Sequence, residues 1–443
     1  MKSRAILRAL VVVALTVPVA CSDSAGPAVP AFAVSPPAQW SGGAITIRSS
    51  YFANRVQAAI LVADGDTLAL TAVDDSTVTA SLPQGPSGEV TVALARGSRL
   101  DDLASVHRVG YSDTRNVTSA GFARYGALQA ADSAGNPLVF GAAATSPNDY
   151  RARIVRLKVV AGTTTLFGLR QPDKTFYGMA PSVTPGVFAV RDSTDTLRMA
   201  RLIDDPPSVL GTAAIRFAST RQVSQLSDSI WLRTASHYTE TFLANDTSGV
   251  SLITTAASES PYAVFLSPRR DRATLWTRVN GTEGGVPVFD NAAGTLAYRL
   301  PFWYVRGAAF SPDGGTLYVA GGQYSADSLV AVDATTGTVQ IPGRKLPGGL
   351  YATGLAYRSG DQLLVGASDE DFDPPTPLFL LVYRASDLQL LGVLPSPFEC
   401  GEPPTVNRCV GGALTIDHPH NRAYIVISDS PIPIVAFDLL GPS

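Results

Sequence analysis

One stretch, residues 310–339, constrains the fold of this chain most, because much of the sequence after residue 115 repeats its plan. It reads FSPDGGTLYVAGGQYSADSLVAVDATTGTV. It begins with an apolar residue and a Ser-Pro-Asp-Gly-Gly turn, after which a strand is expected at 316–320. A polar loop leads to a second strand at 328–333. A Thr-Thr-Gly turn then leads to a third strand that begins at Thr338. The stretch therefore predicts a unit of short antiparallel strands joined by tight turns.

The unit recurs along the chain. Residues 307–310 align with residues 354–357, an offset of 47 residues, and a period of about 40–50 residues with four strands is typical of β-propeller blades. The remaining copies place an innermost and a second strand at 265–268 with 273–277, 412–416 with 423–427, 137–141 with 154–159, 186–190 with 197–202, and 229–233 with 241–243. These copies predict a seven-bladed propeller over residues 115–443.

The last copy supplies only three strands and ends at residues 434–440. An unpaired edge at that place would expose backbone groups, and propellers usually close by pairing it with a strand from before the first blade. Residues 104–110 and 117–124 are both candidates, and the sequence leaves the choice open.

Composition agrees with an all-β chain of more than one domain. The 443 residues include 39 Gly and 32 Pro, and only 16% are charged, which favours frequent turns over long polar helices.

The strand ending in small residues, the polar loop and the Val-Ala-Val-Asp strand of residues 316–339 resemble the YVTN and related WD-type propeller families. FSPDGGTLYV is the matching inner-strand signature. The resemblance implies a fold and leaves function open, because such propellers include binding platforms, lactonases and dehydrogenase subunits.

The N-terminus has the pattern of an export signal. Lys2, Arg4 and Arg8 precede an apolar run at 9–20 that is too short to span a bilayer. The ending Val-Pro-Val-Ala-Cys resembles the lipobox of bacterial lipoproteins, which implies a signal peptide at 1–20, lipidation of Cys21 and a tether at 21–34. An ordinary cleaved signal is the alternative.

These features predict an exported protein of the bacterial cell envelope, facing the periplasm or the surface and held to the membrane through a lipid anchor only. Removing the signal deletes three basic residues and no acidic one, so the mature chain is more acidic than the formal net charge of −3. An acidic chain argues against a nucleic-acid partner.

Two cysteines remain for pairing if Cys21 is lipidated. Cys400 and Cys409 lie in the loop FECGEPPTVNRCVGG, and a disulfide between them is expected in an oxidising compartment. Two free thiols in a cytoplasmic protein are the alternative.

Residues 35–97 have the pattern of a small β-sandwich, followed by a linker at 98–114. Strands are expected at 44–47, 58–63, 67–72, 77–81 and 88–95. Ser-Gly-Gly at 41–43, Tyr51-Phe52, the turn at 75–77 and Leu-Pro at 82–83 followed by Gly-Pro-Ser-Gly resemble the IPT/TIG immunoglobulin-like family. That resemblance implies a spacer or adhesive module without catalytic residues.

Two runs could be interpreted as catalytic or metal-binding. Ser311 and Asp313 could act as nucleophile and base, and His418 and His420 beside Asp417 could bind a metal. Both runs occupy the same turn position in their repeats, and Pro, Asp and Gly are residues that tight turns require, so the sequence favours turns at both.

The loops between the second and third strands of the blades lie on the same face as the entries to the innermost strands. This face collects aromatic residues and carboxylates, a combination that suits a glycan, a cationic peptide or a divalent cation. The candidate ligand-binding residues are Trp303, Tyr304, Arg306, Tyr324, Asp327, Tyr351, Asp369, Glu370, Asp371 and Asp373.

The sequence therefore predicts a binding or scaffolding protein that recognises a cell-envelope protein or glycan through this face. No catalytic residue and no cofactor are expected, although the acidic loops also suit calcium. The alternative is a lactonase-like or other hydrolase that uses the central channel, and metal analysis with a panel of lactones and esters would separate the two.

Overall fold

The computed structural model describes most of the strands of both domains. The described residues are 32–52, 60–96, 99–116, 128–131, 137–143, 153–160, 163–168, 176–181, 187–192, 196–201, 208–216, 222–225, 230–234, 238–243, 253–256, 263–278, 285–322, 327–369, 376–400, 413–426 and 433–441.

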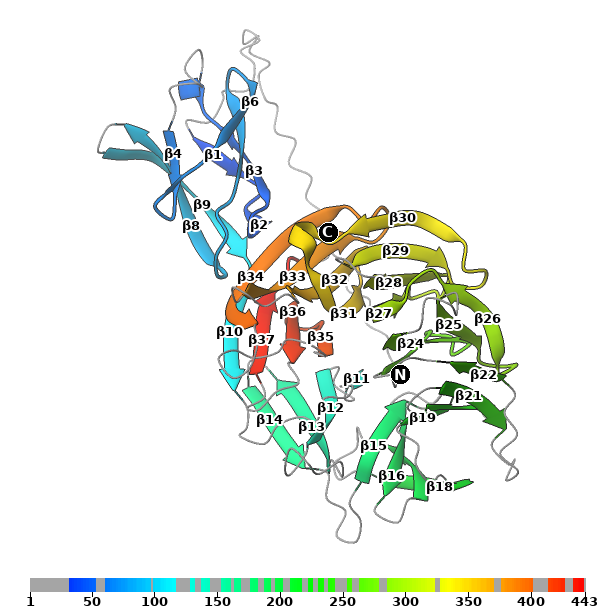
Figure 1. Ribbon diagram of the computed structural model, residues 1–443. Helices are drawn as coiled ribbons and strands as arrows, with labels where there is room; N and C mark the ends of the chain where they lie inside the picture. Colours follow the sequence, from blue (N-terminus) through cyan, green and yellow to red (C-terminus); the bar gives the residue numbers. More distant parts are fainter. Residues whose placement is uncertain are drawn as a thin grey trace, which may run out of the picture.

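Seven four-stranded antiparallel sheets form a ring in the described part of the chain after residue 110 (Figure 1). Short stretches of backbone pairing join two pairs of neighbouring sheets. They lie between Arg153 and Tyr177 and between Thr277 and Val305. The architecture is that of an all-β, seven-bladed propeller, as predicted.

The first three blades are built from twelve strands. They are β11 (Leu128–Ala131), β12 (Pro137–Ala143), β13 (Arg153–Val160) and β14 (Thr163–Gly168); β15 (Phe176–Pro181), β16 (Val187–Asp192), β17 (Thr196–Arg201) and β18 (Ser208–Arg216); and β19 (Gln222–Gln225), β20 (Ile230–Thr234), β21 (Tyr238–Leu243) and β22 (Ile253–Ala256).

The next three blades follow the same order. They are β23 (Ala263–Leu266), β24 (Arg272–Arg278), β25 (Val286–Asp290) and β26 (Thr295–Leu300); β27 (Tyr304–Phe310), β28 (Thr316–Gly322), β29 (Ser328–Asp333) and β30 (Val339–Lys345); and β31 (Tyr351–Arg358), β32 (Gln362–Ser368), β33 (Thr376–Arg384) and β34 (Leu390–Cys400).

The blades adhere through cores that lie between them. In β28, Leu317 and Val319 pack toward the fourth blade, whereas Tyr318 and Ala320 pack toward the sixth. Successive side chains of a strand point to opposite faces, so a middle strand buried on both faces must be apolar at nearly every position. This explains why the repeat shows continuous apolar runs rather than an alternation of apolar and polar residues.

The structure contains the strands predicted for the first three blades, but each lies one strand further from the centre of the ring than the sequence predicted. The segments 137–141, 186–190 and 229–233 were expected to be innermost, but their described residues belong to the second strands β12, β16 and β20. The innermost strands are β11, β15 and β19. Two of them are only four residues long, and β19 reads Gln-Val-Ser-Gln, so they lack the apolar signal of the later blades.

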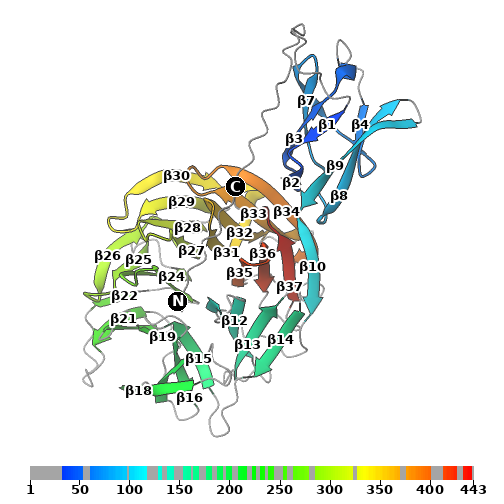
Figure 2. The ribbon, with the colours of Figure 1, turned by 180° about the vertical axis from the view of Figure 1, so that it is seen from behind.

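The seventh blade combines both ends of the propeller. Strands β35 (Ala413–Asp417), β36 (Arg422–Val426) and β37 (Pro433–Asp438) are completed by β10 (Tyr111–Asn116), which pairs antiparallel with β37. Figures 1 and 2 both show β10 beside β37. A strand from before the first blade was expected here, but neither candidate was right: residues 104–110 belong largely to a strand of the sandwich, and 117–124 lie outside the described residues.

The N-terminal domain is a sandwich of two sheets. One contains β1 (Ala33–Ser35), β3 (Ala44–Arg48), β7 (Thr77–Ser81) and β6 (Leu70–Asp74); the other contains β2 (Ala38–Trp40), β9 (Arg99–Val109), β8 (Gly88–Arg96), β4 (Ile60–Ala63) and β5 (Asp66–Thr67). Inward residues of both sheets, including Ile45, Val78, Val92 and Val106, form one buried core.

Two sequence expectations for this region are corrected. The strand expected at 67–72 is divided, because the chain passes from one sheet to the other around the buried Leu68. The segment 98–114 is no linker: β9 completes the sandwich, Gly110 follows, and β10 begins the propeller.

The sandwich is docked on the propeller through shared core residues. Trp40 and Val109 belong to the same buried cluster as Leu378, Leu394 and Phe437 of the sixth and seventh blades. A Cβ at Gly392 would lie 3.0 Å from the Trp40 side chain, so a larger residue there would require the ring to shift by a few tenths of an ångström. The two domains thus meet through an apolar contact as well as through the continuous chain.

Hydrogen bonds fix the chain where it passes between the domains. Gly110 N donates to Ser87 Oγ at 2.9 Å, and Gly110 O accepts from Ser87 Oγ at 3.0 Å and from Asp438 N at 2.9 Å. Arg108, which is buried, donates to Pro86 O at 2.7 Å. These bonds satisfy backbone groups of both domains at one place, which opposes hinge motion there.

Candidate functional site

The face that carries the entries to the innermost strands, here called the entry face, brings together residues of the fifth and sixth blades. Tyr304 and Arg306 lie on β27, Asp327 directly precedes β29, and Tyr351 begins β31. These four residues, which the sequence predicted to share a face, form one cluster in the structure.

Arg306 is the centre of this cluster. Its Nε lies 3.3 Å from Asp327 Oδ2, and its guanidinium carbon lies 5.0 Å from the ring centre of Tyr351 and 5.7 Å from that of Tyr304. Arginine is attracted to the faces of aromatic rings. One largely buried cation therefore contacts two tyrosines of neighbouring blades.

Asp327 lies beneath the surface rather than on it. It is 1% exposed, and its Oδ2 accepts a hydrogen bond from Ala352 N at 2.9 Å. Its backbone also donates to Leu350 O at 3.3 Å and accepts from Leu346 N at 2.8 Å. The sequence suggested a ligand-binding carboxylate, whereas the structure gives Asp327 contacts that connect two blades and orient Arg306.

The aromatic residues are the accessible part of the cluster. Trp303, Tyr304 and Tyr351 are each half-buried. Trp303 N donates to Gly322 O at 3.1 Å, and a Cβ at Gly321 would come within 2.0 Å of Tyr304 O. The small residues that end β28 thus permit the close backbone contact that positions this aromatic segment.

The other predicted site residues are distributed as follows. Asp369 is half-buried directly after β32, and Cys400 is buried at the end of β34. The remaining predicted residues lie outside the described residues: Tyr324, Glu370, Asp371, Asp373, Cys21 and Cys409.

The Ser-Pro-Asp-Gly-Gly run is confirmed as a turn on the opposite face. Ser311 Oγ donates to Asp313 Oδ1, Gly315 N donates to the same oxygen at 3.1 Å, and Thr316 N donates to Ser311 Oγ at 2.9 Å. The hydroxyl of Ser311, followed by the amide of Gly315, lowers the pKa of Asp313 below its usual value. These bonds close the turn, which is what the repeat pattern favoured.

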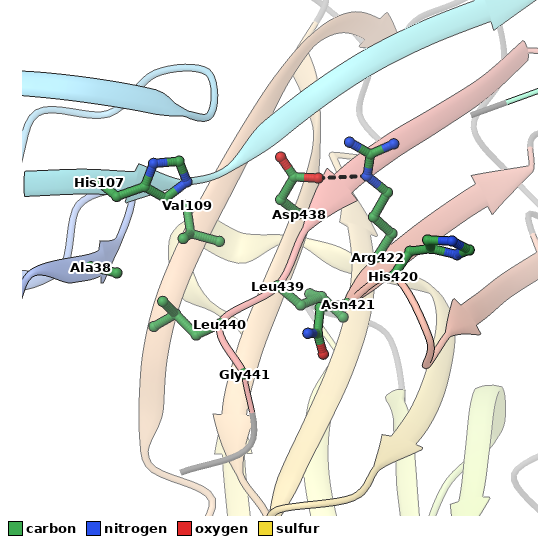
Figure 3. A pocket seen from close by; sticks show the side chains of 10 residues that line it. All are labelled: Ala38, His107, Val109, His420, Asn421, Arg422, Asp438, Leu439, Leu440 and Gly441. Carbon is green, nitrogen blue, oxygen red and sulfur yellow. Dashed lines mark hydrogen bonds and ion pairs between the residues drawn. The ribbon is translucent and has the colours of Figure 1, made fainter. Parts of the chain in front are cut away.

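The histidine turn of the seventh blade has a related arrangement. Both carboxylate oxygens of the fully buried Asp417 lie 2.9 Å from His420 Nδ1. His420 lines a cleft between the sandwich and the seventh blade, which the sequence did not indicate because its two sides are more than three hundred residues apart (Figure 3).

Within the described ranges, no group of three or more His, Cys, Asp or Glu side chains is placed to hold a metal ion. In the same part of the chain, no helix has the length and apolar character to cross a bilayer.

Comparison with known proteins identifies the fold. No family model and no curated protein matches the chain. Among solved structures, a chain in the crystal structure of the mitotic checkpoint complex is similar, with a TM-score of 0.50, 12% identity, and coverage of 78% of this chain and 94% of that chain. At this identity the similarity concerns the fold alone. The chain thus has an all-β propeller architecture.

Proposed function

We propose that this chain is an exported cell-envelope protein that binds a protein partner through the entry face of its propeller. The observation that carries this proposal is the cluster in which Arg306 holds Tyr304 and Tyr351, with Trp303 adjacent in sequence to Tyr304.

The cluster has the chemistry of a binding hot spot. Tryptophan, tyrosine and arginine are enriched among residues that dominate interface affinity, and large aromatic side chains lose little conformational entropy on binding. Because Asp327 and Arg306 are held by buried contacts, the rings are ordered before a partner arrives. Such preorganisation lowers the entropic cost of association.

The structural neighbour supports a role in protein interaction only in general terms. The envelope address rests on the sequence: the basic and apolar N-terminus, the lipobox-like ending at Cys21 and the IPT/TIG-like residues of the sandwich. A disulfide between Cys400 and Cys409 belongs to the same proposal, and thiol titration of the denatured protein with and without reductant tests it.

The test compares the wild-type protein with the double variant Trp303→Ala, Tyr304→Ala. Each is immobilised and exposed to a detergent-solubilised envelope fraction of the source cells, and the retained proteins are quantified. The double variant should lose one or more specific partners, because truncating a central aromatic residue costs about 2 kcal/mol or more of binding free energy.

Leu103→Ala provides the matched control, since Leu103 is an exposed apolar residue of the sandwich. This control should retain the same proteins as the wild type, and melting curves should show that all variants are folded. Equal retention by the wild type and the folded double variant would contradict recognition through this face. Specific elution by free sugars would instead indicate a glycan partner.

A further inference from the structure

An open cleft lies between the sandwich and the seventh blade. Its volume is about 570 Å³, and it lies at a domain junction, where small-molecule sites often occur. The sandwich contributes His107 and Val109, and the seventh blade contributes His420, Asp438 and Leu439 (Figure 3). The cleft is distinct from the entry face and from the function proposed for that face.

Two histidines of the cleft each contact a carboxylate through Nδ1. His107 Nδ1 lies 3.0 Å from Glu89 Oε1, and His420 Nδ1 lies 2.9 Å from both oxygens of Asp417. In the tautomer in which Nδ1 carries the proton, each ring donates a hydrogen bond to its carboxylate. In the neutral ring this leaves Nε2 as a hydrogen-bond acceptor, and both acceptors therefore belong to rings that line the same cleft.

Donor groups accompany these acceptors. Asn421 Oδ1 accepts from Arg358 NH2 at 2.6 Å, which directs the amide nitrogen, a donor, away from Arg358. Arg422 Nε donates to Asp438 Oδ1 at 2.7 Å, so this pair contributes no net charge to the lining. Val109, Leu439 and Leu440 add apolar surface.

This combination suits a neutral ligand rich in hydroxyl groups. A hydroxyl both donates and accepts, so it can meet the imidazole acceptors as well as the amide and guanidinium donors. A carboxylate ligand at the two imidazoles would approach the carboxylates of Glu89 and Asp417 that contact them, and an ammonium ion has no acceptor for the donors of Asn421 and Arg422. We propose that the junction cleft binds a saccharide, with its hydroxyls on the polar rim and its C–H face on Val109 and Leu439.

The NMR signals of the histidine rings can report binding directly, because the chain contains only four histidines. The full-length protein with isotope-labelled histidine would be titrated with glucose, galactose, mannose, N-acetylglucosamine, maltose and cellobiose, each to tens of millimolar. Phenylacetate and putrescine serve as the anionic and cationic probes. We expect at least one sugar to shift the ring signals of His107 and His420 saturably and to leave that of His237 unchanged.

Two substitutions in one turn separate binding from folding. His420→Gln should raise about tenfold the sugar concentration at which the shift of the His107 signal is half complete, since it removes one oriented acceptor. His418→Gln, two residues away and outside the cleft lining, should leave binding unchanged. If His420→Gln fails to fold, Ala38→Phe, which fills the cleft from the sandwich side, gives the same comparison.

Three outcomes would overturn the proposal. They are a panel in which no sugar shifts either ring, a stronger response to phenylacetate or putrescine than to every sugar, and unchanged sugar binding in the folded His420→Gln or Ala38→Phe variant.

Discussion

At the scale of single residues, the largest departure from the sequence expectation is Asp327. A carboxylate in a polar loop is expected at the surface, yet this one is buried against Arg306 and the backbone of Ala352. A buried charge is tolerated only when it is paired and hydrogen-bonded, and both partners come from other strands, β27 and β31. The residue pattern therefore placed these residues on one face but could not separate the residue that orients Arg306 from those that face solvent.

Replacing Asp327 with Asn should lower the free energy of unfolding by about 3 kcal/mol, because it leaves the largely buried Arg306 without its carboxylate. The shift in the midpoint of chemical denaturation measures this effect. Asp66→Asn is the matched control at an exposed position of the sandwich and should leave the midpoint unchanged. A wild-type midpoint in Asp327→Asn would contradict the role assigned to the pair.

Asp333 predicts a pH dependence of stability. Its Oδ1 accepts from Thr336 N at 2.8 Å and from Thr335 N at 2.9 Å, and these bonds, that from Thr336 first, lower its pKa below 3.8. Because the folded pKa lies below the unfolded one, the stabilisation is complete above about pH 3.8 and is lost as the pH falls through the folded pKa.

The melting temperature of Asp333→Ala should accordingly lie below that of the wild type at neutral pH, and the difference should shrink under acid conditions. Melting curves across the acid range measure it. A difference that stays constant down to the most acidic pH at which both proteins fold would count against the ionised carboxylate.

At the scale of elements, β10 determines how the ring closes. It is the outermost strand of the seventh blade and follows the last sandwich strand with only Gly110 between them. The ring of Tyr111 also packs edge-on against Phe437, at 6.4 Å between centroids. Since β10 is Tyr-Ser-Asp-Thr-Arg-Asn, it has no apolar alternation that would mark it as a strand. Its strand conformation depends on the edge of β37, a partner more than three hundred residues away.

Two truncated chains test the closure. A chain beginning at Tyr111 retains β10, whereas one beginning at Val117 exposes the edge of β37. The shorter chain should melt at a lower temperature and should associate, because an unpaired strand edge is a template for pairing with another chain. Size-exclusion chromatography and melting curves compare them, and identical behaviour of the two chains would contradict closure by β10.

At the scale of the whole molecule, the sandwich and the propeller share a core. Trp40 is 4% exposed and lies with Val109 in the cluster that holds the sixth and seventh blades together. Arg358, also buried, connects the sixth blade to the seventh by donating to Asn421 Oδ1 and Leu440 O, which steadies the two blades on which the sandwich is docked. The spacer inferred from the sequence is therefore better described as a rigid extension of the ring.

Trp40→Ala should uncouple the two domains. The substitution removes about 3–5 kcal/mol of packing free energy from a buried site at the junction, so calorimetry should show two unfolding transitions where the wild type shows one. Val73→Ala, made at an exposed position of the sandwich, is the control and should retain the single transition. One unchanged transition in Trp40→Ala would show that the docking does not depend on this residue.

The sequence by itself determined the all-β class, the seven blades and the face on which Tyr304, Arg306 and Tyr351 meet. These features follow from local signals, namely turn residues, apolar strands and a period that repeats along the chain. The tertiary structure decided which strand closes the ring, which strand of each early blade lies innermost, that Asp327 is buried, and that a cleft lined by His107 and His420 exists at the domain junction. All four depend on contacts between residues far apart in the chain, and a local pattern carries no information about which distant surface a strand or side chain will meet.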